Sequence, residues 1–189
     1  MKMTRVKICC LFLTALQVLS GMAQTAKSEA PAQPFAFNVR APALVSEPFD
    51  WINTDGQKLE FRRGHVYVVE FWAFGCINCL RNLPAYARWQ KKFEGKSVTI
   101  IGVHSPETDA ERQREKVVRQ IEKLGITYPV LLDNQMTNWK RWQQQVWPTV
   151  YLVDKLGRAR FRWVGELAWM GAKGEELMAA RIEQLLREP

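Results

Sequence analysis

One stretch of the chain constrains the fold more than any other: an apolar run followed closely by a pair of cysteines. The run covers residues 66–72 (Val-Tyr-Val-Val-Glu-Phe-Trp), a β-prone composition typical of a strand covered on both faces. After the short turn at residues 73–75, Cys76 and Cys79 open a helical pattern that continues to about Phe93. The sequence therefore predicts a buried strand leading into a helix whose first turn carries both sulfurs.

The chain holds two further cysteines, but these lie in an N-terminal segment with the features of an export signal: Cys9 and Cys10. Basic residues precede an apolar run at residues 8–19, and small residues fit a cleavage site near Ala23-Gln24. The run is shorter than the ~18 to 20 residues that a bilayer-spanning helix needs. We predict a cleaved signal peptide over residues 1–23 and a periplasmic or secreted protein, with an uncleaved anchor as the alternative.

Removal of the signal changes the charge that bears on possible partners. The full chain of 189 residues has 27 basic and 19 acidic residues, for a net charge of +8. Residues 1–23 contain three basic and no acidic side chains, so a net charge of about +5 remains. Without an aromatic–basic RNA motif, this charge gives no support for nucleic-acid binding. Proline and alanine in residues 24–42 predict a linker, and residues 43–189 fit one domain.

In an oxidising compartment, a lone cysteine pair forms a disulfide unless it is continually reduced. A bridge between Cys76 and Cys79 closes a very small loop and removes little entropy from the unfolded chain, so a purely stabilising role is disfavoured. Half of a zinc site is a second alternative, which would need further ligands such as His65 and His104. The sequence favours a third interpretation, a redox-active Cys-x-x-Cys pair.

The remaining pattern alternates strands and helices and predicts an α/β fold with a parallel core. A hairpin is expected over residues 49–61, around the Asp55-Gly56 turn. A capping box, Thr108-x-x-Glu111, precedes a helix with one apolar face. The other expected elements are a strand at 98–103, a short strand at 128–132, a short helix at 136–144, a hairpin of strands at 150–153 and 159–164, and a helix at 174–187.

The position of each cysteine predicts its role. Backbone N–H groups and the helix dipole favour a thiolate at Cys76, which is the expected nucleophile. Cys79, one turn further along the helix, is the expected resolving thiol. Glu70 is the one carboxylate in the apolar run, and a buried carboxylate has a raised pKa and can accept the proton of Cys79. The alternative is that Glu70 faces an exposed edge.

These features resemble the thioredoxin superfamily. The W-A-x-x-C-x-x-C pattern follows the strand, and Pro84 matches the proline that bends the active-site helix of thioredoxins. Glu70 stands where thioredoxin has its buried aspartate. Two features of the pattern differ from thioredoxin: Gly75 replaces a tryptophan, and the dipeptide between the cysteines, which tunes the reduction potential, is Ile77-Asn78.

The resemblance also assigns a substrate-binding region. Pro148, in Trp147-Pro148-Thr149, matches the cis-proline that faces the disulfide, with a trans proline that starts a strand as the alternative. Beside a cis-proline, the backbone of Trp147 presents an unpaired edge to which an extended substrate segment can add. The residues expected to contact substrate are Trp147, Thr149, Phe74 and Gly75.

The long segment between Cys79 and Pro148 is similar to that of the secreted TlpA-like branch, and motifs at residues 71–84, 103–107 and 132–134 are most similar to the thioredoxin-like domain of DipZ proteins. The resemblance covers about residues 43–187. It implies a thioredoxin-like fold, in which helices flank a central mixed sheet, with an N-terminal hairpin and an inserted helix–strand unit.

The resulting hypothesis is a periplasmic or secreted thiol–disulfide oxidoreductase that reduces or exchanges disulfides in exported proteins. Reductive work would require a membrane electron donor, because the compartment oxidises the pair. We expect no metal or organic cofactor and no stable membrane insertion. Two alternatives use the same sulfurs: a copper(I)-binding module with His104 as a further ligand, and a thiol peroxidase with a sulfenic acid at Cys76.

Overall fold

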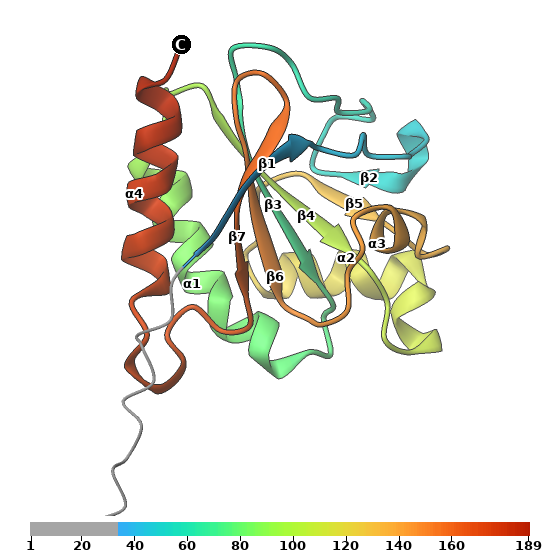
Figure 1. The fold of residues 1–189 in the computed structure, drawn as a ribbon. Helices are drawn as coiled ribbons and strands as arrows, with labels where there is room; N and C mark the ends of the chain where they lie inside the picture. The colour runs from blue at the N-terminus through green and yellow to red at the C-terminus, as the bar shows by residue number, and fades with distance from the viewer. Residues whose placement is uncertain (1–33) are drawn as a thin grey trace, which may run out of the picture. The chain divides into compact units, whose positions relative to one another are not determined.

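A seven-stranded mixed sheet forms the centre of residues 34–189, the part of the chain that the computed structural model describes (Figure 1). The strand order is β1-β7-β6-β3-β4-β5-β2. The strands are β1 (Phe35–Arg40), β2 (Trp51–Ile52), β3 (Val66–Trp72), β4 (Val98–His104), β5 (Val130–Leu132), β6 (Thr149–Val153) and β7 (Arg158–Val164). The predicted α/β fold, a mixed sheet flanked by helices, is confirmed.

In the described part of the chain, four α-helices and three short 3-10 helices lie between or after these strands. The α-helices are α1 (Ile77–Lys92), α2 (Arg114–Lys123), α3 (Thr137–Arg141) and α4 (Gly174–Arg187). The 3-10 helices are η1 (Pro48–Asp50), η2 (Asp109–Arg112) and η3 (Trp169–Gly171). None of the helices in the described part of the chain is long and apolar enough to cross a bilayer.

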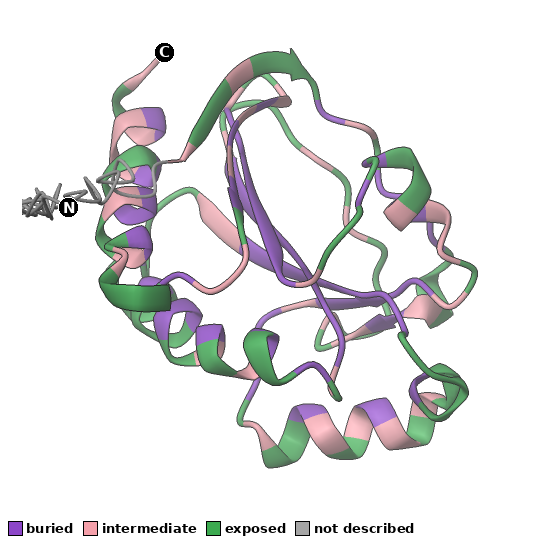
Figure 2. Cartoon of the chain, turned by 60° about the horizontal axis from the view of Figure 1, so that its bottom comes forward, coloured by how far each residue is buried: buried purple, intermediate pink, exposed green. Residues whose placement is uncertain are grey.

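The central strand β3 is parallel to β4 on one side and antiparallel to β6 on the other. All seven of its residues are buried, as Figure 2 shows for the middle of the sheet. Val66 and Val68 face a core shared with α1, α2 and α4, whereas Tyr67, Val69 and Phe71 face a second core on the opposite side of the sheet. Burial on both faces explains the nearly continuous apolar run.

Helices α1 and α4 lie side by side over one face of the sheet (Figure 1). They contribute apolar side chains to the same core, among them Tyr86 and Trp89 from α1 and Ile182 and Leu185 from α4. The opposite face is covered by residues 41–51 and by side chains from and just after α3. Because α1 starts directly after β3, the two cysteines lie at the carboxyl end of the central strand.

Two predictions for the N-terminal part of the domain are wrong. No hairpin forms over residues 49–61: only β2 is a strand there, and it pairs with β5. Asn53 adopts a positive φ and donates its side-chain amide to the carbonyls of Ile126 and Tyr128, so the chain after β2 follows the β5 side of the domain instead of folding back on itself.

The predicted linker at residues 24–42 is also wrong where the structure describes it, because β1 lies within it and pairs with β7. No proline interrupts residues 35–41, and Phe37 packs edge-on against Tyr151 at 6.1 Å between ring centroids. The remainder of that segment before residue 34, and the predicted signal peptide at residues 1–23, lie outside the described residues.

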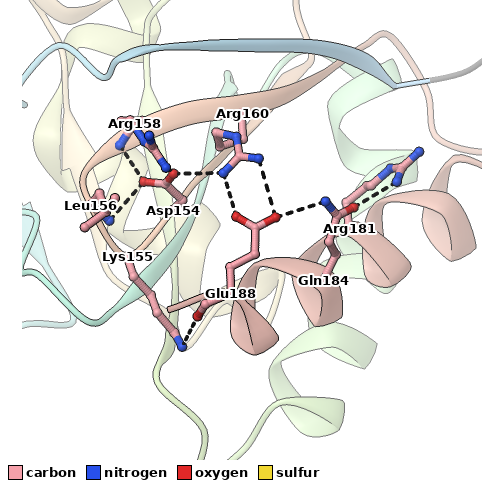
Figure 3. Close-up of polar contacts among 8 residues, drawn as sticks. All are labelled: Asp154, Lys155, Leu156, Arg158, Arg160, Arg181, Gln184 and Glu188. Carbon is pink, nitrogen blue, oxygen red and sulfur yellow. Dashed lines mark hydrogen bonds and ion pairs between the residues drawn. The ribbon is translucent and has the colours of Figure 1, made fainter.

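A polar network joins the β6–β7 turn to the end of α4 (Figure 3). The carboxylate of Asp154, almost fully buried, accepts hydrogen bonds from the backbone of Leu156 and Arg158 and from the side chains of Arg158 and Arg160. Burial alone would raise the pKa of Asp154, but these hydrogen bonds outweigh it and hold the pKa below its usual value. Arg160 also pairs with Glu188 at 2.6 Å.

We predict that Asp154→Ala lowers the free energy of unfolding by about 1–3 kcal/mol, because it leaves buried donors without an acceptor. Urea unfolding of the oxidised protein measures this change. Glu60→Ala, which removes an exposed carboxylate 3.7 Å from Lys58, is the control and should leave the midpoint unchanged. Equal midpoints for the two variants would show that the network does not support the fold.

Candidate active site

Cys76 and Cys79 are joined by a disulfide at the start of α1, with their Cα atoms 5.3 Å apart. Cys76 is the N-cap of the helix, and its sulfur accepts a hydrogen bond from the backbone N–H of Cys79 at 3.3 Å. Cys79 is fully buried, whereas Cys76 retains 9% exposure. An incoming thiol or thiolate therefore reaches the sulfur of Cys76 first.

The helix environment favours negative charge at Cys76 once the disulfide is reduced. The positive end of the α1 dipole and the free N–H groups of its first turn lie at the N-cap. No acidic side chain occupies that first turn. The geometry therefore fits the predicted division of labour, in which Cys76 is the nucleophile and Cys79 the resolving thiol, although the roles themselves stay predictions.

Glu70 lies fully buried in β3, which excludes the alternative of an exposed edge. Its Oε1 accepts a hydrogen bond of 2.5 Å from the hydroxyl of Tyr128, and its Oε2 has no partner among residues 34–189. Burial raises the pKa of Glu70 to about 8, against the opposing effects of the Tyr128 and Tyr86 hydroxyls. Glu70 is therefore mostly protonated at neutral pH.

The structure does not join Glu70 directly to the sulfurs: within the described residues its hydrogen-bond partner is Tyr128. Cys79 nevertheless belongs to the same core as Tyr128 and Tyr86, whose rings meet edge-on. The carboxyl group and the resolving cysteine thus border one buried region. A proton passing between them would need an intervening water or a side-chain movement, and Glu70 as proton acceptor stays a prediction.

Gly102 makes room for the buried carboxyl group, a role that the sequence pattern did not reveal. It lies opposite Glu70 on β4. A Cβ at this position would come within 2.9 Å of the Trp72 indole nitrogen and 3.4 Å of Glu70 Oε1. A glycine in the middle of an apolar strand is the sequence signal for such a close approach.

The peptide bond between Trp147 and Pro148 is cis. The half-buried indole of Trp147 donates its N–H to the carbonyl of Ser105 at 3.0 Å and stacks on Trp139 of α3, with ring centroids 3.9 Å apart. Thr149 is buried, and its hydroxyl donates to the carbonyl of Val146. Of the predicted substrate-contacting residues, Trp147, Phe74 and Gly75 remain accessible, and the Thr149 side chain does not.

His104 is a buried structural residue at the end of β4. Its Nε2 accepts the backbone N–H of Phe74 at 3.3 Å, and its ring stacks on Phe74 and meets Trp72 edge-on. Burial lowers the pKa of His104 to about 4, so the ring is neutral at physiological pH. Nε2 is therefore occupied by the Phe74 N–H and is not free to bind copper(I) together with the sulfurs.

The second histidine lies elsewhere. His65 precedes β3, at the opposite end of that strand from the cysteines, and its Nε2 is 2.8 Å from the Thr99 hydroxyl. Within residues 34–189, no group of three or more His, Cys, Asp or Glu side chains is placed to hold a metal ion. The zinc alternative thus gains no support from the histidines.

Glu111 was predicted only to begin a helix, but it also contacts the active-site turn. Its Oε1 accepts the backbone N–H of Gly75 at 2.8 Å. The capping box with Thr108 is present, yet it caps η2, and α2 starts after Gln113. The contact between Glu111 and Gly75 joins residues 36 positions apart in the sequence, which a local pattern does not reveal.

Comparison of the sequence with known proteins shows which proteins resemble this chain. The family model described as AhpC/TSA family matches residues 39–162. Protein DipZ of Mycobacterium tuberculosis is 38% identical over 119 residues, which are 61% of this chain but 17% of DipZ, so the chain spans less than a fifth of that relative. The thiol-disulfide oxidoreductase YkuV of Bacillus subtilis is 20% identical over 78% of this chain and 94% of YkuV.

Among solved structures, the thiol-disulfide isomerase of Corynebacterium glutamicum superposes with a TM-score of 0.64 and 25% sequence identity. The match covers 79% of this chain and 98% of the isomerase. This match over most of both chains shows that the domain has the thioredoxin-like architecture predicted from the sequence.

We predict that the stability of the protein falls with rising pH because of Glu70. In the unfolded chain the Glu70 carboxyl group has its ordinary pKa of 4.5, but in the fold its pKa is about 8. Between these values the folded state keeps a proton that the unfolded state has lost, so stability decreases by up to ~1.4 kcal/mol per pH unit. Glu70→Gln stays neutral and should gain stability relative to the wild type as the pH rises.

Urea unfolding of both oxidised proteins at several pH values from about 5 to 9 measures this difference. Glu122→Gln, at an exposed position of α2, controls for the loss of one carboxylate. A Glu70→Gln difference that does not change with pH would show that Glu70 is ionised in the fold.

Proposed function

Since the chain belongs to the AhpC/TSA family, we propose that it is a thiol–disulfide oxidoreductase that exchanges disulfides with exported proteins. The observation that carries this proposal is the Cys76–Cys79 disulfide at the start of α1, with one partly exposed and one buried sulfur. The similarity to YkuV and to the Corynebacterium glutamicum isomerase supports it.

In the reductive direction, the Cys76 thiolate attacks one sulfur of a substrate disulfide. The substrate S–S bond breaks, a mixed disulfide with Cys76 forms, and the released substrate sulfur takes up a proton. Cys79 then loses its proton and attacks the Cys76 sulfur. The mixed disulfide breaks, the second substrate sulfur leaves and is protonated, and two electrons have passed from the cysteine pair to the substrate.

Glu70 is suited to hold the proton that Cys79 releases. In the oxidised protein, the raised pKa of about 8 keeps Glu70 mostly protonated, which is the state expected after Cys79 has given up its proton. When an external thiolate attacks Cys76 in the reverse direction, Cys79 leaves as a thiolate and can recover the proton from Glu70. The buried carboxyl group thus keeps the proton in the buried region that Cys79 also borders.

The compartment determines what the protein needs from its partners. The predicted signal peptide at residues 1–23 supports a periplasmic or secreted location, where a free cysteine pair becomes oxidised. Work as a reductant then requires a donor of electrons, which we assign to a membrane protein bearing a reducing dithiol. Transfer from that dithiol would follow the same two exchange steps in reverse.

The surface beside the disulfide fits a polypeptide substrate. A groove of about 390 Å³ starts at Asn78, between the cysteines, and is bordered by Arg81, Val164 and Trp169. Trp169 is 57% exposed and Ile77, next to Cys76, is 58% exposed. A protein chain that brings its disulfide to Cys76 can cover these apolar side chains, whereas a small disulfide has no atoms to reach them.

We predict that Cys79→Ser accumulates mixed disulfides through Cys76, because the resolving thiol is missing. The variant expressed in its native host should show reductant-sensitive, higher-mass species on a non-reducing gel. Cys76→Ser is the matched control and should show none. Absence of trapped species, together with absence of insulin reduction by the wild type, would refute the proposed function. Rapid peroxide consumption by the reduced wild type would favour a thiol peroxidase instead.

We predict that Trp169→Ala slows reduction of a protein disulfide such as insulin by about 5- to 30-fold, since an aromatic side chain at the centre of a contact contributes on the order of 1–2 kcal/mol. Reduction of oxidised glutathione should be unchanged. Phe49→Ala removes another exposed aromatic, next to β2 at the far edge of the sheet, and should affect neither substrate. An equal loss with both substrates for Trp169→Ala would contradict a docking role.

A further inference from the structure

Two acceptors hold the turn between β3 and α1. The backbone N–H of Phe74 donates to His104 Nε2 at 3.3 Å, and the N–H of Gly75 donates to Glu111 Oε1 at 2.8 Å. Phe74 and Gly75 are the two residues directly before Cys76. The end of β4 and the segment that follows it therefore fix the backbone that delivers the reactive sulfur.

The hydrogen bonds of Glu111 identify it as a carboxylate. Its Oε2 accepts from the backbone N–H groups of Glu107 and Thr108, both at 2.8 Å, and from the Thr108 hydroxyl at 3.1 Å. With Gly75, three of its four partners are backbone N–H groups, which can only donate. A side chain surrounded by donors is stable in its ionised form, because that form only accepts.

This negative charge is buried and has no cationic partner in the described part of the chain. Glu111 is 1% exposed, and no lysine or arginine among residues 34–189 forms a salt bridge with it. The charge also acts on a neighbouring carboxyl group. Burial raises the pKa of Glu107, and the Glu111 charge raises it further. A charge in such surroundings is weakly screened by water and salt.

The Glu111 carboxylate also explains why Gly75 departs from the thioredoxin pattern. A Cβ at position 75 would lie 3.0 Å from Glu111 Oε1, a closer approach than side chains ordinarily make. Gly75 does not have a positive φ, so the close approach, and not the backbone conformation, favours glycine here. The space next to the turn is occupied by the carboxylate.

The position of this charge opposes the helix dipole. The N-terminus of α1 stabilises a thiolate at Cys76, and a carboxylate bound to the preceding residue destabilises it. Reduction converts the disulfide, two electrons and two protons into two thiols, and ionisation of Cys76 then stabilises the reduced form further. Any charge that disfavours the thiolate therefore favours the disulfide and lowers the reduction potential.

We propose that Glu111 is a positioning residue that fixes Gly75 and holds a negative charge against the active-site turn, so that the Cys76–Cys79 pair is a stronger reductant than the helix dipole alone would make it. The proposal deepens the proposed function, since it rests on a pair that cycles between disulfide and dithiol. It names a side chain that shifts the pair towards the reducing direction of exchange.

The test is the reduction potential of Glu111→Gln in the full chain, measured by equilibration with glutathione redox buffers. Removing the charge should shift the equilibrium constant about tenfold towards the dithiol, which corresponds to a rise of about 30 mV. The pKa of the Cys76 thiol, followed by thiolate absorbance in the ultraviolet, should fall in parallel. An unchanged potential and thiol pKa would overturn the proposal.

Two matched variants separate charge from contact. Glu111→Asp keeps the charge on a shorter side chain and should stay closer to the wild type than Glu111→Gln. Asp109→Asn removes a fully exposed carboxylate from the same η2 helix and should leave the potential unchanged. Equal shifts for Glu111→Gln and Glu111→Asp would show that only the contact matters, and would overturn the role of the charge.

If Glu111→Gln does not fold, as judged by circular dichroism, Gly75→Ala supplies a second measurement. Its methyl group makes the carboxylate shift by a few tenths of an ångström, so the equilibrium constant should move towards the dithiol by less than the tenfold expected for the charge removal, and no change would overturn the proposal. Small-thiol buffers report the potential whether or not proteins are substrates. Failure here is therefore distinguishable from failure of the trapping experiment with Cys79→Ser.

Discussion

Burial of β3 on both faces is the constraint on which the active site depends. Because its side chains alternate between two cores, the strand has a fixed register against β4 and β6, and its carboxyl end delivers Cys76 to one position above the sheet. The same burial removes water from Glu70, the one carboxyl group in the strand. Gly102 leaves space for this group, so it can remain inside without displacing the neighbouring strand.

Two buried glutamates near the disulfide differ in charge because their hydrogen-bond partners differ. Glu70 has one donor, the Tyr128 hydroxyl, and burial dominates, so it keeps its proton to about pH 8. Glu111 has four donors and is held as a carboxylate. One carboxyl group is therefore able to exchange a proton near neutral pH, while the other is a fixed charge, a separation of roles set by surroundings alone.

Local periodicity is sufficient to predict the central strands and the long helices. The spacing of apolar residues within β3, α1 and α4 already shows which of their faces are buried. It failed for the edge strands. Strand β1 pairs with β7 and β2 pairs with β5, both distant in the sequence, and neither edge strand has a strong alternating pattern. The Glu111 capping box was visible, and so was the unusual Gly75, but the contact that connects them is tertiary.

The segment between β5 and β6, which carries α3, supports the other side of the disulfide site. Asp133 accepts the backbone N–H of Trp139 and the hydroxyl of Ser105, and Trp147 in turn stacks on Trp139 and donates to the Ser105 carbonyl. The end of β4 and the segment after it thus hold the turn before Cys76, and the segments after β4 and β5 together hold the residue before the cis-proline. Both surfaces that a substrate contacts are already ordered in the free protein. Substrate binding therefore does not include the entropic cost of ordering these loops.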